Sequence, residues 1–130
     1  MNRFVLPFLA ALSLGSAAMA EDVAIATARG EVTLPAKPAK VVVYDIAAID
    51  TLLSLGVPLA GVPDNLYISD LDAGGAPTVG TLFEPDLEAL AGIAPDLVIV
   101  GGRSVTQLDA VSQGGPAIDM TIGTDLIADA

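Results

Sequence analysis

The sequence predicts an α/β fold, in which helices flank a parallel β-sheet and a β-hairpin precedes it. From residue 40 onward, short runs of β-branched and aliphatic residues alternate with segments that have the apolar spacing of helices. Gly, Pro, Asn and Asp separate these segments, as expected for turns. The strand-like runs are continuously apolar, which is typical of parallel strands buried on both faces.

The first predicted element is the hairpin. Two strand-like runs, 23–28 and 31–34, lie on either side of Gly30. The segment 35–40 contains two prolines, which remove backbone donors and fix φ, so it is predicted to be a connector.

The first strand–helix unit follows the connector. The run 40–44 predicts a buried strand, and Asp45 can cap the next helix. That helix has one apolar stripe, formed by Ile46, Ile49, Leu52 and Leu53. Gly56 and Pro58 are expected to end the helix, and 59–62 predicts a second short strand.

The second half of the chain repeats the alternation after a surface loop at 64–77. Pro85 is expected in the first turn of a second helix, and 97–100 is predicted to be the next buried strand. The inward side of that helix is predicted to carry Leu87, Leu90 and Ala91. A capping box at 104–107 predicts a third helix, and 117–122 predicts a last strand.

This topology predicts where a ligand would bind. Ligands of parallel α/β sheets lie outside the carboxyl ends of the strands. The candidate ligand face therefore comprises residues 44–45, 80–84 and 101–104.

Composition excludes several function classes. The chain has no Cys and no His, which excludes disulfides, thiolate or imidazole metal sites, Ser-His-Asp triads and Cys nucleophiles. It carries 16 acidic and 5 basic residues, and the formal net charge of −11 disfavours nucleic acid and anionic lipid as partners. No residue pattern indicates a catalytic residue or a resident metal, so we do not expect an enzyme.

Residues 1–20 resemble a signal peptide. Arg3 supplies a positive n-region, 4–14 is mostly apolar, and 18–20 reads Ala-Met-Ala. Cleavage is expected after Ala20, which leaves 21–130 as the mature domain. Because no Cys stands at the cleavage point, a free periplasmic protein is expected rather than a lipid-anchored one.

Three blocks carry a family resemblance. They are 41–57, with Val-Val-Val-Tyr-Asp; 79–88, with Gly-Thr-Leu-Phe-Glu-Pro-Asp; and 94–104, with Pro-Asp-Leu-Val-Ile-Val-Gly-Gly-Arg. Together they resemble the amino-terminal lobe of periplasmic iron(III)–siderophore-binding proteins of ABC importers, most closely the branch for catecholate siderophores. The resemblance covers essentially the whole mature chain.

This resemblance implies a non-catalytic, monomeric binding protein of class III, in which a long helix joins two α/β lobes. It implies no cofactor: the ferric siderophore is a ligand held in the cleft, and the lobes dock on a membrane permease. Such proteins are roughly twice as long as this chain, in keeping with two domains. The sequence is therefore expected to be either a fragment or a lone lobe, without the linking helix and the second lobe.

The expected ligand-binding residues lie on the candidate ligand face. The matching Arg of the family points into the cleft, so Arg103 is expected to bind an anionic ferric catecholate, the alternative being a surface ion pair. Tyr44 and Phe83 could stack on a catechol ring or cover the core edge. Gly102 could help to cradle an anion, permit close ligand approach or form a plain tight turn. Two further candidates complete the set, Thr81 and Ser104.

Two acidic residues are candidates for permease docking. Glu88 matches the acidic residue through which such proteins meet arginines of the permease, and Glu84 is a second candidate. For Glu88, the alternative is an ordinary first-turn acid that stabilises its helix.

Other functions remain open at this point. A cobalamin-binding or haem-binding protein is compatible with the same fold, although three Phe and two Tyr provide little aromatic surface. A Rossmann-like nucleotide-dependent enzyme is disfavoured by the missing glycine fingerprint. A non-functional truncated lobe is the remaining alternative.

Overall fold

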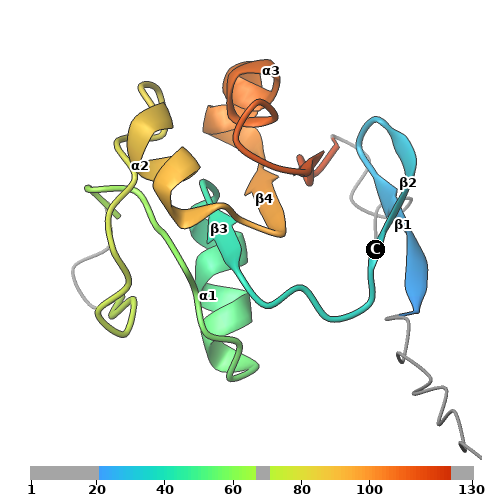
Figure 1. Ribbon diagram of the computed structural model, residues 1–130, viewed down its shortest axis with the longest axis horizontal. Helices are drawn as coiled ribbons and strands as arrows, with labels where there is room; N and C mark the ends of the chain where they lie inside the picture. Colours follow the sequence, from blue (N-terminus) through green and yellow to red (C-terminus); the bar gives the residue numbers. More distant parts are fainter. Residues whose placement is uncertain (1–20, 67–70, 124–130) are drawn as a thin grey trace, which may run out of the picture.

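The computed structural model describes residues 21–66 and 71–123 and confirms the α/β fold (Figure 1). The signal peptide expected at 1–20 lies outside the described residues. The elements are β1 (Asp22–Thr27), β2 (Gly30–Pro35), β3 (Val41–Val43), α1 (Ile46–Ser54), α2 (Leu87–Ile93), β4 (Leu97–Val100), the 3-10 helix η1 (Gly102–Gln107), α3 (Leu108–Val111) and β5 (Ala117–Asp119).

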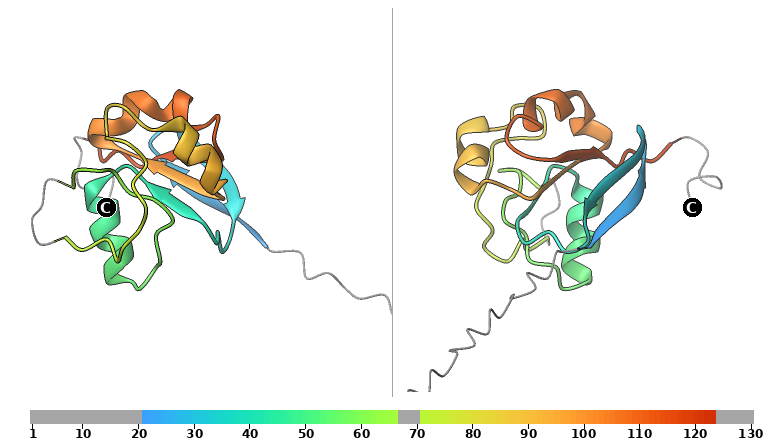
Figure 2. Two further views of the ribbon diagram at one scale, coloured as in Figure 1. Left: turned by 60° about the vertical axis from the view of Figure 1, so that its left-hand side comes forward. Right: turned by 45° about the vertical axis from the view of Figure 1, so that its right-hand side comes forward.

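The main sheet is parallel, with strand order β3-β4-β5. Along β3 and β4, alternate side chains enter two separate cores, as the pleat requires. Val41, Val43 and Leu97 pack with α1 on one face, whereas Val42 and Val98 pack with α2 and α3 on the other. The left view of Figure 2 shows α1 below the strands and the other two helices above them.

The hairpin is antiparallel, as predicted, with Thr27 opposite Gly30 at its turn. It packs on the α1 side of the sheet through the buried side chain of Leu34 and the half-buried Ile25 and Val32. The N–H of Ala28 also donates to the carbonyl of Asp119, over 2.9 Å. The hairpin therefore contacts the far end of the described chain.

The strand expected at 59–62 is not formed as a regular strand. Residues 61 and 62 make only isolated parallel bridges, from Gly61 to Val42 and from Val62 to Thr78. Pro58, Pro63 and Pro77 flank these bridges, and a proline has no N–H with which to continue a ladder. These segments extend the sheet beyond β3 by single bridges.

Helix α1 begins as predicted. Asp45 is its N-cap, and the carboxylate accepts a hydrogen bond from the N–H of Ala48 over 2.8 Å. Ile49 is completely buried, and Leu52 and Leu53 pack against the same core. The helix ends at Ser54, shortly before Gly56, which has a φ of 74°.

Helix α2 begins later than predicted, and it buries a different face. Pro85 precedes the helix, and the N-cap is Asp86, which accepts hydrogen bonds from two backbone N–H groups. Leu90 is completely buried as expected, but Leu87 and Ala91 are exposed. Ile93 takes the inward position instead, because it lies three residues after Leu90 on the same face.

The predicted capping box at 104–107 is absent. After β4, the chain enters η1 at Gly102, so Ser104 lies within the first turn and is buried. The last strand stops at Asp119, three residues earlier than expected. It stops there because the N–H of Thr121 donates to the side-chain carboxylate of Asp119. No helix within 21–66 or 71–123 is long and apolar enough to span a membrane.

Candidate functional site

A cavity of about 570 Å³ lies where the topology predicts it, at the carboxyl ends of β3 and β4. This volume falls within the range of sites for small molecules. Its lining comes from the start of α1, the loop after β4 and one residue of the 80–85 loop: Tyr44, Asp45, Ile46, Ala47, Asp50, Leu82, Gly101, Gly102 and Arg103.

Arg103 is exposed and brings a cationic side chain to the cavity. The loop that carries it can approach α1 closely because two glycines precede it. A Cβ at Gly101 would stand 3.2 Å from the carboxylate of Asp45, and Gly102 has a φ of 52°. The glycine pair thus forms the tight turn that places Arg103 beside the N-terminus of α1.

The glycine pair does not form an anion cradle, however. The N–H of Gly101 donates to the hydroxyl of Ser104 over 3.2 Å, and the N–H of Gly102 donates to the hydroxyl of Thr121 over 3.1 Å. Both backbone donors are therefore engaged within the protein. Of the roles considered for Gly102, the structure favours the tight turn.

Ser104 supports the cavity from behind and does not belong to its lining. It is completely buried, and its hydroxyl donates to the carbonyl of Tyr44 over 2.7 Å. Since this hydroxyl also accepts from Gly101, it joins the ends of β3 and β4. The structure therefore gives the Ser104 hydroxyl a structural role.

Tyr44 lines the cavity but belongs mainly to the core. It is 1% exposed, and its hydroxyl donates to the carbonyl of Val79 over 2.8 Å. Burial raises the pKa of Tyr44 far above its usual range, and the carboxylates of Asp86 and Asp64 raise it further. The structure thus favours the core role over stacking on a ligand.

Thr81 and Phe83 lie beside the cavity but not in its lining. The hydroxyl of Thr81 accepts hydrogen bonds from the N–H groups of Phe83 and Glu84, which shapes the turn. Phe83 is 53% exposed on this turn. Of the six predicted ligand residues, the structure brings Tyr44, Gly102 and Arg103 together around the cavity.

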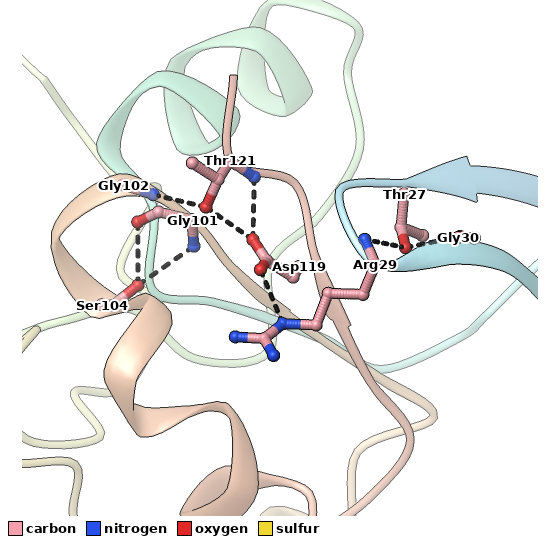
Figure 3. A network of polar contacts seen from close by, with 8 residues as sticks. All are labelled: Thr27, Arg29, Gly30, Gly101, Gly102, Ser104, Asp119 and Thr121. Carbon is pink, nitrogen blue, oxygen red and sulfur yellow. Dashed lines mark hydrogen bonds and ion pairs between the residues drawn. The ribbon is translucent and has the colours of Figure 1, made fainter. Parts of the chain in front are cut away.

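A second polar cluster stands next to the Arg103 loop (Figure 3). Asp119, at the end of β5, is 4% exposed, and its carboxylate accepts from the Thr121 hydroxyl and N–H. Arg29, from the hairpin turn, donates to the same carboxylate over 2.9 Å. Burial acts to raise the pKa of Asp119, but the hydrogen bonds from Thr121 and Arg29 outweigh it and lower the pKa.

Several residues that line the cavity were not predicted from the sequence. Ile46, Ala47 and Asp50 belong to the first turns of α1, which face the carboxyl edge because the helix begins directly after β3. That adjacency was readable in the sequence. No group of three or more acidic side chains in the described residues could hold a metal ion.

The known proteins that this chain resembles in sequence include binding proteins of the same kind. No model of a protein family matches the chain. The petrobactin-binding protein YclQ of Bacillus subtilis is 34% identical over 96 residues, which are 70% of this chain and 30% of YclQ. The putative ABC transporter substrate-binding lipoprotein YhfQ of the same organism is 36% identical over 84 residues, or 59% of this chain and 26% of YhfQ.

Solved structures agree with the sequence comparison. The periplasmic catecholate-siderophore-binding protein VctP of Vibrio cholerae superposes with a TM-score of 0.65 at 33% identity, over 76% of this chain and 37% of VctP. The structure of YclQ superposes with a TM-score of 0.67 at 30% identity. The chain thus spans about a third of the length of these proteins.

The fold is that of one lobe of a class III periplasmic binding protein, with its cavity at the carboxyl edge of the sheet. Within that class, the chain is similar in sequence and structure to siderophore-binding substrate-binding proteins of ABC importers. Such relatives are binding components of transport systems rather than enzymes. This confirms the resemblance noted in the sequence and agrees with the expectation that the chain is not an enzyme.

Proposed function

We propose that this chain captures an iron(III)–siderophore complex and delivers it to an ABC importer. The main support is the position of Arg103, which brings a guanidinium to the cavity at the carboxyl edge of the sheet. A ferric tris-catecholate is an anion with flat rings, and a guanidinium offers both charge and a planar face. The siderophore is the transported ligand, and no cofactor takes part.

The relatives support this chemistry. YclQ is named for petrobactin and VctP for catecholate siderophores, and both resemble the chain in the described lobe. Asp45 and Asp50 also line the cavity, and Arg103 is the cationic residue in its described lining. An anionic ligand therefore depends strongly on Arg103.

Isothermal titration of the full chain with ferric enterobactin, a tris-catecholate complex, tests the proposal. We expect binding by the wild type and a loss of affinity of about tenfold or more for Arg103→Ala, as for a charge-assisted contact. Lys37→Ala is the matched control, because it removes one positive charge from the exposed connector, outside the cavity lining.

Each other outcome has a defined meaning. Equal affinity of wild type and Arg103→Ala removes Arg103 from the site. Binding of cobalamin or haem in place of ferric enterobactin identifies one of the other ligand classes of this fold. A stabilisation by NAD or ATP would indicate the nucleotide-binding alternative, and the absence of any ligand effect on thermal unfolding would indicate a non-functional lobe.

We further propose that Glu88 and Glu84 guide docking on the permease. Both are exposed, Glu88 in the first turn of α2 and Glu84 in the turn before it. Charge reversal of both to Lys is expected to abolish siderophore uptake in cells while leaving affinity for ferric enterobactin unchanged. Glu31→Lys, on the exposed hairpin, is the control, and unchanged uptake by the double variant contradicts the docking role.

The proposed location is the periplasm. We infer that 1–20 is removed after Ala20, and that 21–130 forms the amino-terminal lobe of a monomeric binding protein. Intact-mass analysis and N-terminal sequencing of the exported protein are expected to give a chain that begins at Glu21. A chain retaining residues 1–20 would contradict cleavage, and a stable dimer on gel filtration would contradict the monomer.

A further inference from the structure

The loop that carries Arg103 is held by a hydrogen-bond chain that begins outside the cavity. The N–H of Gly102 donates to the hydroxyl of Thr121, and that hydroxyl donates to the carboxylate of Asp119. Figure 3 shows the chain running from the loop to the end of β5. Neither Asp119 nor Thr121 lines the cavity.

The direction of these bonds is fixed by chemistry. An ionised carboxylate only accepts, so the single hydroxyl proton of Thr121 is directed at Asp119. The lone pairs of the hydroxyl oxygen are then left to accept from Gly102. Asp119 thus orients the Thr121 hydroxyl so that it accepts from the N–H of Gly102 in the Arg103 loop.

The carboxylate of Asp119 is also bound by the hairpin. The Nε of Arg29 donates to Oδ2 of Asp119, while Thr121 uses Oδ1 through both its N–H and its hydroxyl. The carbonyl of Asp119 also accepts from the hairpin, at the N–H of Ala28. The hairpin, β5 and the Arg103 loop therefore share one network.

The loop needs such support because of its backbone. Gly102 has a φ of 52° and is exposed. A glycine backbone can adopt more conformations than that of any other residue, so this position is not fixed by its own sterics. Without its bond to Thr121, Gly102 would leave the direction of the neighbouring Arg103 less defined. Sites that bind tightly hold their contact residues through such outer contacts.

We propose that Thr121 and Asp119 are positioning residues, which fix Gly102 and thereby set the direction in which Arg103 meets an anionic ligand. The inference rests on the proposed siderophore-binding function. It adds a role for the end of β5 and for the hairpin turn, which do not themselves line the cavity.

Thr121→Val tests the inference, because valine keeps the shape of threonine but cannot accept from Gly102. We expect the affinity of the full chain for ferric enterobactin to fall about tenfold, as for other residues that orient a ligand contact. Thr121→Ser keeps the hydroxyl and is expected to bind like the wild type. Thr33→Val, on the exposed side of β2, is the matched control.

A measurement without ligand tests the hydrogen bond between Gly102 and Thr121 directly. Amide hydrogen exchange of Gly102 is expected to be faster in Thr121→Val, with exchange of the β4 amides unchanged, and Thr121→Ser is expected to restore protection. A Thr121→Val protein with wild-type Gly102 exchange and wild-type affinity overturns the inference. So does an equal loss of affinity in Thr121→Val and Thr121→Ser.

The two proposals fail in different ways. If the wild type does not bind ferric enterobactin, the proposed function for this ligand is wrong, and the positioning role falls with it even if Gly102 exchange changes. If the wild type binds and Arg103→Ala weakens binding, but Thr121→Val does not, only the positioning role is wrong.

Discussion

Tyr44 shows how a single buried hydroxyl can tie the sheet to the neighbouring loop. Its bond to the carbonyl of Val79 joins the end of β3 to the segment before the 80–85 loop. Tyr44→Phe is expected to lower the free energy of unfolding by about 1 kcal/mol, the net value of one such hydrogen bond. Urea denaturation at neutral pH measures this, and equal stability of both proteins would show that the bond contributes nothing.

The raised pKa of Tyr44 has a consequence at alkaline pH. Its stabilising contribution is fully present below the ordinary tyrosine value of 10.0 and is lost as the pH rises toward the higher pKa of the folded state. The difference in the free energy of unfolding between the wild type and Tyr44→Phe should therefore decrease above about pH 10. A difference that stays constant with pH would contradict the burial of the hydroxyl.

Asp119 gives the opposite dependence on the acid side. Its folded pKa is lowered below the ordinary value of 3.8, so its contribution is present above that value and is lost as the pH falls through the folded pKa. Acid unfolding of Asp119→Asn should therefore be less steep than that of the wild type below about pH 4. Parallel acid-unfolding curves would contradict the proposed state of the carboxylate.

At the scale of elements, the 80–85 loop depends on one glycine. Gly80 has a φ of 85°, and a Cβ there would meet the backbone N of Asp86 at 2.4 Å and the carbonyl of Glu84 at 2.5 Å. Gly80→Ala is expected to destabilise the protein by about 2 kcal/mol or more, since neither backbone group can move independently.

Gly92 is the matched control for that substitution. It lies in α2, and nothing stands within 4 Å of an added Cβ. Gly92→Ala is expected to stabilise the protein by roughly 0.5–1 kcal/mol, because alanine has the higher helix propensity. Thermal unfolding compares the two variants. Destabilisation by both would mean that the geometry of the 80–85 loop does not cause the effect of Gly80→Ala.

The elements that the sequence predicted correctly have local signals. The hairpin, β3, α1 and β4 follow from Gly30, the Asp45 cap and uninterrupted apolar runs. Other features depend on contacts distant in sequence. Serine is a residue type that often caps helices, but the hydroxyl of Ser104 donates to the carbonyl of Tyr44, 60 residues away. Composition alone cannot reveal such a partner.

The same distinction applies to the site. Topology predicted the edge of the sheet that carries the cavity, and with it Arg103 and Gly102. Whether a residue at that edge faces the cavity or the core depends on packing, which is why Tyr44 and Ser104 turn inward. The part played by Thr121 could not be predicted, since its bond to Gly102 needs the position of β5.

For the whole molecule, Leu34 is the test of how firmly the hairpin is attached. It is buried in the core on the α1 side, together with Val41 and Leu97. Leu34→Ala is expected to cost about 2–4 kcal/mol and to detach the hairpin from the sheet. Faster amide exchange throughout β1 and β2 would show detachment, and exchange unchanged from the wild type would mean that other contacts hold the hairpin.

The bond between Arg29 and Asp119 joins residues 90 positions apart. The hairpin is formed first along the chain, but its bonds to Asp119 can form only once β5 is in place. Contacts of such sequence separation close late in folding. A nascent chain would therefore lack the bonds between the hairpin and Asp119 until residue 119 emerges, and the Gly102–Thr121 bond of the Arg103 loop would form in the same late step.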